Sequence, residues 1–197
     1  MAKKIDTAKI ESCVRELLIA LGDDPEREGL KETPMRVARM YAEMFRGMTY
    51  TNEEIAKLFD TTFEQEDYIR PNDKNLVVVR DIPIFSYCEH HMALMYNMRV
   101  SVVYRPVEKI IGLSKIARIA DMVGRRLQLQ ERIGNEIAEI VSMVTESPDV
   151  GVLVQGEHSC MTARGIEKPG TLTVTSSFRG VFQEDDFLRQ EALILLK

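Results

Sequence analysis

Side chains that can hold a metal ion are gathered in two short segments of the sequence. The chain has three histidines and three cysteines, and all but one of these six residues fall in the two segments. Cys88 and His91 are three residues apart, a separation that a tight turn can close around one ion, and thiolate and imidazole both suit zinc. His158 and Cys160 are two apart, so an extended strand would project both from one face. We predict that the two segments form one metal site.

The number of candidate ligands favours a catalytic metal over a structural one. Structural zinc usually has four protein ligands, whereas catalytic zinc has three and keeps a position for water. His90 and His91 are adjacent, and adjacent side chains diverge on a strand or turn, so we expect one to bind metal and the other to face substrate. The favoured ligands are therefore Cys88, His91 and Cys160. His90 and His158 are then acid or base groups beside a zinc-bound water.

The alternative, for any one of these residues, is an ordinary buried thiol or a hydrogen-bonded core histidine. Their concentration in two segments favours the metal site. The rest of the composition sets the class of protein: 197 residues with a formal net charge of −5 can form one or two domains with a hydrophobic core. The acidic balance argues against general nucleic-acid binding but allows a local basic pocket.

Neither a membrane protein nor a disulfide-stabilised one is expected. The sequence has no run of about 18 apolar residues, and its first residues lack an apolar signal core, so we expect a cytoplasmic protein. The three cysteines are widely spaced and odd in number, which is not the pattern of a disulfide framework.

Hydrophobic periodicity predicts helices in the first part of the chain. Residues 5–21 follow helical spacing, and this apolar stripe includes Cys13 as a predicted core residue. A second helix is expected from Thr33 as N-cap and Pro34 as its first residue to near Gly47.

The second part of the chain changes to strand-like patterns. After a short helix and a connector at 51–73, β-branched or alternating runs predict strands at 76–82, 100–104, 109–111, 150–155 and 171–178. Residues 114–147 predict two helices that meet near 124–130. The predicted fold class is therefore α+β, with a helical N-terminal region at 1–73 and a domain at 74–197. That domain should have a mostly antiparallel sheet with two helices on one face.

Two pairs of basic residues are candidate anion ligands. Lys115 and Arg118 follow Ser114 in the first turns of a predicted helix, where free N–H groups and the helix dipole also favour a phosphate. Arg36 and Arg39 share the flank of the second helix that lies away from its apolar face. Solvated surface cations are the alternative for both pairs, and for Arg36 and Arg39 spacing alone favours it.

Glu131 lies among arginines in the segment 125–132. A carboxylate that faces a pocket can accept two hydrogen bonds from an amidine-like edge, such as the N1–H and 2-amino group of guanine. The alternative is a surface ion pair with Arg126 or Arg132, and periodicity does not decide between the two.

Four motifs, taken in order, resemble those of the GTP cyclohydrolase I family. They are CEHH at 88–91, GLSKIARI at 112–119, RRLQLQER at 125–132 and HSCMTARG at 158–165. The resemblance covers roughly residues 8–182. It implies a zinc enzyme that converts GTP and water to 7,8-dihydroneopterin triphosphate and formate, the first step of tetrahydrofolate and pterin biosynthesis. It also implies a tunnelling fold and a toroidal homodecamer of two pentamers, with active sites between subunits.

The resemblance assigns roles residue by residue. The zinc ligands that it implies are Cys88, His91 and Cys160. His90 and His158 match the family's acid or base histidines, and the hydroxyl of Ser114 is a further candidate for moving a proton at the ribose.

The substrate contacts that the resemblance implies divide between base and triphosphate. Gln130 and Glu131 match the pair that recognises guanine. The matches to triphosphate contacts are Lys115, Arg118 and Arg164. Arg36 matches a phosphate ligand from a neighbouring subunit, and Arg39 stands where the family also has lysine.

One segment departs from the family pattern. After His91 the chain has an extra residue before Tyr104, which changes the expected geometry of the hairpin. Two other classes stay open: another tunnelling-fold enzyme acting on a pterin or deazapurine, against which the three zinc ligands count, and a non-catalytic zinc-stabilised assembly protein. The second class would have no need of His90 and His158.

Overall fold

The computed structural model describes residues 4–64, 75–107 and 109–197. Contacts divide the chain into two compact units, Met1–Tyr50 and Thr51–Lys197. The helix that follows residue 50 therefore belongs with the second unit, whereas the predicted division falls after residue 73. Part of the predicted connector lies outside the described residues. Among the described residues, no helix is both long and apolar enough to cross a membrane.

The first unit contains the two predicted helices, α1 (Thr7–Ala20) and α2 (Thr33–Met44), followed by the short 3-10 helix η1 (Arg46–Thr49). Asp6 caps α1 by accepting a hydrogen bond from the backbone N–H of Lys9. The predicted start of α2 is one residue late. Thr33 is already helical, Glu32 holds the cap position without a side-chain bond, and Pro34 lies within the first turn, where its missing N–H costs nothing.

The prediction that Cys13 is a core residue is wrong. Cys13 is exposed, as are Leu17 and Leu21 on the same apolar stripe. Val14 is the buried residue of α1. The physical reason is that α1 packs against a single helix of its unit, and one neighbouring helix covers only a narrow strip of a helix surface.

The second unit is built on a five-stranded sheet with the order β5-β2-β3-β6-β7. Its strands are β2 (Val77–Cys88), β3 (Ala93–Tyr104), β5 (Leu127–Gln128), β6 (Val150–His158) and β7 (Thr173–Phe178). All pairings are antiparallel except the short parallel one between β2 and β5. A separate ribbon pairs β1 (Thr62–Glu64) with β4 (Lys109–Ile111). The five predicted strands are confirmed. β1 and β5 were not predicted.

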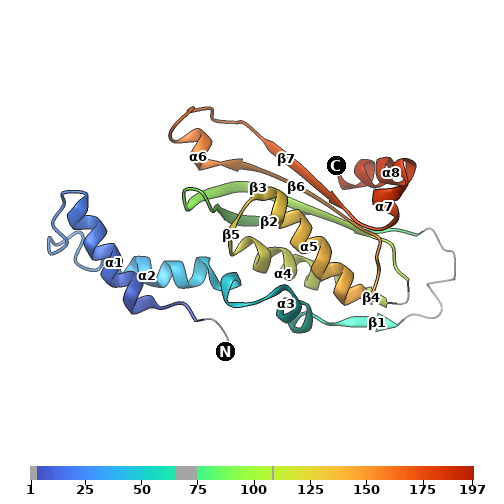
Figure 1. The fold of residues 1–197 in the computed structure, drawn as a ribbon, viewed down its shortest axis with the longest axis horizontal. Coiled ribbons are helices and arrows are strands. Elements are labelled where there is room, and N and C mark those ends of the chain that lie inside the picture. The colour runs from blue at the N-terminus through green and yellow to red at the C-terminus, as the bar shows by residue number, and fades with distance from the viewer. Residues whose placement is uncertain (1–3, 65–74, 108) are drawn as a thin grey trace. The chain divides into compact units, whose positions relative to one another are not determined.

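Helices cover both faces of the sheet, as Figure 1 shows for α4 (Leu113–Gly124) and α5 (Gln130–Thr145) on one face and for α7 (Val181–Glu184) and α8 (Asp186–Leu196) near the C-terminus. Alternation along β3 separates two cores. Val102 packs in the large core shared with α4 and α5, whereas Val103 packs with Phe182 and Leu196. The predicted pair of helices on one face is confirmed. Shorter helices are α3 (Asn52–Leu58) and α6 (Ser159–Thr162).

Helix α4 packs along β2, with its start toward the first residues of that strand and its end beside Phe85. Near its start, the backbone N–H of Ile111 donates to the buried hydroxyl of Tyr104 over 3.2 Å, and Tyr104 pairs with Val77, the first residue of β2. At its end, Gly124 lies against the backbone of Phe85, and β5 follows to pair with the last residues of β2. The first turn of α4 and the last residue of β2 therefore lie at opposite ends of the sheet.

We expect Gly124→Ala to destabilise the fold. A Cβ at this position would lie 2.7 Å from the carbonyl oxygen of Phe85, and overpacking of this kind costs about 1–3 kcal/mol. Without the contact, replacing a helical glycine by alanine would stabilise the protein by about 1 kcal/mol. The sign of the change in unfolding free energy therefore tells whether the close contact exists. Chemical denaturation measures it. Gly112→Ala, whose new Cβ would have its nearest neighbour at 3.6 Å, is the matched control. A Gly124→Ala protein more stable than the unsubstituted chain would contradict the close approach.

Candidate active site

Two chain reversals meet at one end of the sheet, at the ends of β2 and β6 (Figure 1). Cys88, the last residue of β2, pairs with Ala93 at the start of β3. His158, the last residue of β6, pairs with Met95, two residues further along β3. Both candidate segments are therefore held against the first residues of one strand, although 70 positions separate them in the sequence.

The turn after β2 is held by bonds to its neighbours. The backbone N–H of His91 donates to the carbonyl of Cys88 over 3.3 Å, and that of Glu89 donates to the carbonyl of Gln128 over 3.0 Å. Arg132 on α5 donates two hydrogen bonds to the Glu89 carboxylate, at 2.6 and 3.2 Å. This pairing holds the pKa of Glu89 below its usual range. The ion pair ties the turn to α5.

Three side chains form a group that could hold a metal ion: Cys88, His91 and Cys160. Their ligand atoms all lie within 4.8 Å of one another. In a tetrahedral zinc site, with bonds of about 2.0–2.3 Å, ligand atoms lie about 3.3–3.8 Å apart. Small side-chain movements would bring these atoms to that spacing. The donor set, two thiols and an imidazole, fits zinc and leaves a fourth position open. His90 is outside the group, although its Nδ1 lies 3.8 Å from the Cys88 sulfur.

The expectation that His158 and Cys160 share one strand face is wrong. β6 ends at His158, and Cys160 lies in the helical turn α6. Bonds to β3 hold this turn in place: the Ser159 hydroxyl donates to the Leu94 carbonyl over 2.7 Å, and the Tyr96 hydroxyl lies 3.3 Å from that of Thr162. The turn brings Cys160 to Cys88 by a route that the spacing of two residues does not reveal.

The electrostatics of the group disfavour free thiolates. Burial raises the pKa of Cys160, and the neighbouring Cys88 raises it further. Arg164 opposes the shift through its charge, and its Nη1 lies 2.8 Å from Nε2 of His91. A divalent cation would reverse this balance, because a thiol that coordinates a metal is deprotonated.

His158 lies beside Gln130 and Glu131, at the start of α5. Its Nε2 is 2.8 Å from Oε1 of Gln130. Burial lowers the pKa of His158, and the negative charge of Glu131 partly opposes this. The Gln130 side chain is buried, and its Nε2 donates to the backbone carbonyls of Val154 and Thr173 over 3.1 and 3.0 Å.

The ion pair expected as the alternative role of Glu131 is not found. Arg126 pairs with Glu136 at 2.7 Å, and Arg132 pairs with Glu89. Within residues 4–64, 75–107 and 109–197, no basic side chain pairs with Glu131, which is exposed. The carboxylate is therefore available to a ligand. The Arg132–Glu89 and Gln130–His158 contacts were missed, because no local spacing signals a contact between distant segments.

The predicted phosphate ligands on α4 do not join the metal group within one chain. Ser114, Lys115 and Arg118 lie in the first turns of α4, at the Val77 end of the sheet. About 15 Å of helix, at a rise of 1.5 Å per residue, separates Ser114 from the end of α4, which lies nearer to Cys88. Arg164, in contrast, does lie at the group.

The remaining predicted phosphate ligands are in the first unit. Arg36 and Arg39 are exposed on α2. Arg36 forms an ion pair with Glu32, one helical turn away. Their relation to the metal group stays a prediction.

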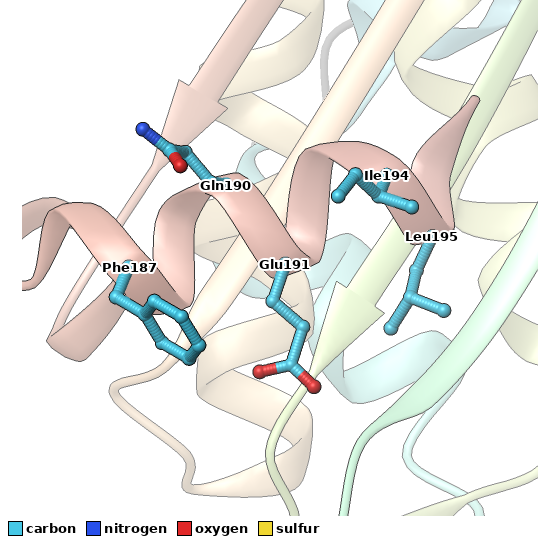
Figure 2. Close-up of a pocket in the computed structure, with 5 residues that line it drawn as sticks. All are labelled: Phe187, Gln190, Glu191, Ile194 and Leu195. Atoms are coloured by element: carbon cyan, nitrogen blue, oxygen red, sulfur yellow. The ribbon is translucent and has the colours of Figure 1, made fainter.

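A surface hollow on α8 contains none of the predicted residues (Figure 2). Its lining residues all come from this one helix: Phe187, Gln190, Glu191, Ile194 and Leu195. Phe187 and Ile194 are about three-quarters exposed. One carboxylate among apolar side chains offers no acid–base pair or metal site. The candidate active site is therefore the turn after β2 together with the end of β6.

Residues 10–197 match the model of the GTP cyclohydrolase I family. The chain belongs to this family. The GTP cyclohydrolase 1 of Clostridium beijerinckii is 70% identical over 197 residues, which is all of both chains. That of Clostridium botulinum strain Langeland is 60% identical over 191 residues, 97% of each. The resemblance predicted from the four motifs, and the prediction of an enzyme of this family, are confirmed.

A solved structure is less similar. The archaeosine synthase QueF-Like in its apo form matches 55% of this chain and 97% of its own, with a TM-score of 0.45 and 19% identity. That level of similarity shows neither a shared fold nor a shared function.

Zinc binding should release protons and weaken as the pH falls. The raised pKa of Cys160 means that the metal-free thiol stays protonated at neutral pH, whereas the metal takes the thiolate. Lowering the pH therefore favours the proton over the metal, and proton release disappears above the raised pKa. Calorimetric zinc titrations in buffers of different ionisation enthalpy measure both effects. Cys160→Ser should bind zinc more weakly, and Cys13→Ser should match the unsubstituted protein. Equal affinity at about pH 6 and about pH 8 would contradict thiolate ligation.

Proposed function

We propose that this protein is a zinc-dependent GTP cyclohydrolase that converts GTP and water to 7,8-dihydroneopterin triphosphate and formate, at the head of tetrahydrofolate and pterin biosynthesis in the cytoplasm. The observation that carries the proposal is the group of Cys88, His91 and Cys160, with His158 and the exposed Glu131 on adjoining elements. A chain of the GTP cyclohydrolase I family with these parts has what the hydrolysis of a purine ring requires.

Cys88, His91 and Cys160 would hold the zinc. Bound there, the ion would polarise a water molecule and lower its pKa toward neutrality, supplying the nucleophile for C8 of the base. Three protein ligands leave a coordination position for that water.

The histidines handle protons in this proposal. Opening the imidazole ring of guanine requires a proton on the departing ring nitrogen, and His90 and His158 are the acid groups near the metal ligands. A second addition of water releases formate. The later rearrangement at the ribose and the closure of the new ring need further proton transfers, for which the Ser114 hydroxyl and a histidine are the candidates.

Substrate recognition uses a carboxylate for the base and cations for the triphosphate. Glu131 accepts from the N1–H and 2-amino group of guanine, a contact that would select GTP over ATP. Gln130 was predicted as its partner in the base site. The proposed triphosphate ligands are Lys115, Arg118 and Arg164, with Arg36 and Arg39 from a neighbouring subunit. These cations anchor the substrate and contribute less to the rate.

Two subunits are needed to complete such a site. The metal group and the first turn of α4 lie at opposite ends of the sheet, so one chain cannot present both to one GTP molecule. A neighbouring copy can present its α4 to the metal group, and cyclic symmetry repeats the contact. This supports a homo-oligomer with sites between subunits, which we propose to be a toroidal decamer of two pentamers with the tunnelling fold that the resemblance implies.

We expect the metal-loaded protein to release formate from GTP together with a pterin that fluoresces after oxidation. Chelation should abolish both products, and zinc should restore them. His158→Ala should lose turnover while it keeps zinc and its assembly, because the acid–base group is removed without touching a ligand. Zinc binding without formate, from folded and assembled protein, would refute the proposal in favour of another tunnelling-fold reaction or a structural role.

Mixing two inactive variants tests whether sites lie between subunits. Lys115→Ala weakens the binding of GTP and Cys160→Ala removes a metal ligand, so at GTP concentrations well below KM each variant alone should have little activity. Oligomers reassembled from equal amounts should regain about a quarter of the unsubstituted rate, because each interfacial site draws its two halves independently. Size-exclusion chromatography checks that both variants assemble. No recovery from mixed oligomers would place both ligands in one chain's site.

A further inference from the structure

The orientation of the Gln130 side-chain amide is determined by the sheet beneath it. Gln130 is the first residue of α5 and only 2% exposed. One end of its amide faces two backbone carbonyl oxygens, those of Val154 on β6 and Thr173 on β7, at 3.1 and 3.0 Å. Carbonyl oxygens only accept hydrogen bonds, so the group that faces them must be the NH₂. The reverse orientation would place three acceptors together without a proton.

This orientation leaves Oε1 of Gln130 facing His158, 2.8 Å from Nε2. An amide oxygen only accepts, so Nε2 of His158 must carry the proton. A neutral imidazole has one N–H, and its lone pair is then on Nδ1. None of the residues that the structure describes forms a hydrogen bond with this Nδ1. The lone pair is therefore available to a ligand.

The same contacts argue against Gln130 as a direct ligand of the base. Its Nε2 has two backbone acceptors and its Oε1 has the imidazole, so each end of the amide is already engaged. If Gln130 bonded to the substrate, a buried carbonyl or the imidazole N–H would lose its hydrogen-bond partner. An unpaired buried polar group costs free energy. Glu131, the next residue, is exposed and has no such partners.

We propose that Gln130 is a positioning residue: it holds His158 in the Nε2–H tautomer, so that Nδ1 is the nitrogen that exchanges a proton with the substrate. Strands β6 and β7 orient the amide of Gln130, and this amide, at the start of α5, orients the imidazole of His158. The reaction that the proton serves rests on the proposed function, whereas the tautomer and its dependence on Gln130 do not.

The first test is the tautomer itself, in zinc-loaded protein labelled with ¹⁵N-histidine. The chain has only three histidines, and the spectrum of His158→Gln assigns the signals of His158. We expect nitrogen shifts of a neutral ring protonated at Nε2. A ring protonated at Nδ1 in the unsubstituted protein would overturn the proposal without any variant.

Gln130→Met tests the dependence on the amide, because methionine has a similar shape but neither donates nor accepts strongly. We expect the His158 signals to shift toward a mixture of tautomers. Gln128→Met is the matched control: Gln128 is equally buried, at 1% exposed, and its amide bonds to Val123 and Glu136 instead. It should lose stability but keep the His158 signals. Unchanged signals in folded Gln130→Met would contradict the positioning role.

The kinetic test separates positioning from base recognition. We expect Gln130→Met to lower kcat about 10- to 100-fold, the loss found when a partner that orients a functional histidine is removed, with KM for GTP nearly unchanged. A rise in KM with kcat retained would instead make Gln130 a guanine ligand.

Failure of the wider proposal can be told apart from failure of this one. If the tautomer depends on Gln130 but GTP yields no formate, the cyclohydrolase function fails and the positioning role stands. If formate is released and neither the tautomer nor kcat responds to Gln130→Met, the positioning role fails alone.

Discussion

Strand β3 is hydrogen-bonded along both edges, and this double pairing determines where every candidate metal ligand lies. β2 on one side and β6 on the other both run antiparallel to it, so the turn after Cys88 and the end of β6 at His158 must meet at its first residues. An irregularity lies between Tyr96 and Arg99 in the pairing with β6, at Asn97, which has a φ of 52°. A shift of one residue in strand register exchanges the two faces of a strand, so this bulge helps to decide which side chains of β6 face the helices.

The contacts around the candidate site matter more for positioning its side chains than for the free energy of unfolding. The Glu89–Arg132 pair is partly exposed, and such pairs add only about 0–1 kcal/mol. Its two hydrogen bonds nevertheless fix the turn that carries two of the candidate histidines. On the same helix, Gln130 contacts β6, β7 and His158. The start of α5 therefore organises both the turn with the candidate metal ligands and His158, the proposed acid–base residue.

The sheet separates the candidate metal group from predicted triphosphate ligands on α4, although one GTP molecule would need both. A triphosphate, a sugar and a base extend well beyond the metal group, and two of the predicted triphosphate ligands, Lys115 and Arg118, lie in the first turns of α4, away from that group. In the proposed function, the site closes only when two subunits assemble. The activity of the proposed site would then depend on formation of the oligomer.

The sequence by itself determined the local elements and the chemistry. Most of the longer strands and helices follow from periodicity, the concentration of cysteine and histidine predicted a metal site, and four motifs in order identified the family. Only the tertiary structure decided that Cys13 is exposed, that Cys160 lies on a helical turn, and that Glu89 bonds Arg132 and Gln130 bonds His158. The physical reason is range: periodicity and capping act between residues a few positions apart, whereas these outcomes depend on strand register and on packing between segments that are distant in the chain.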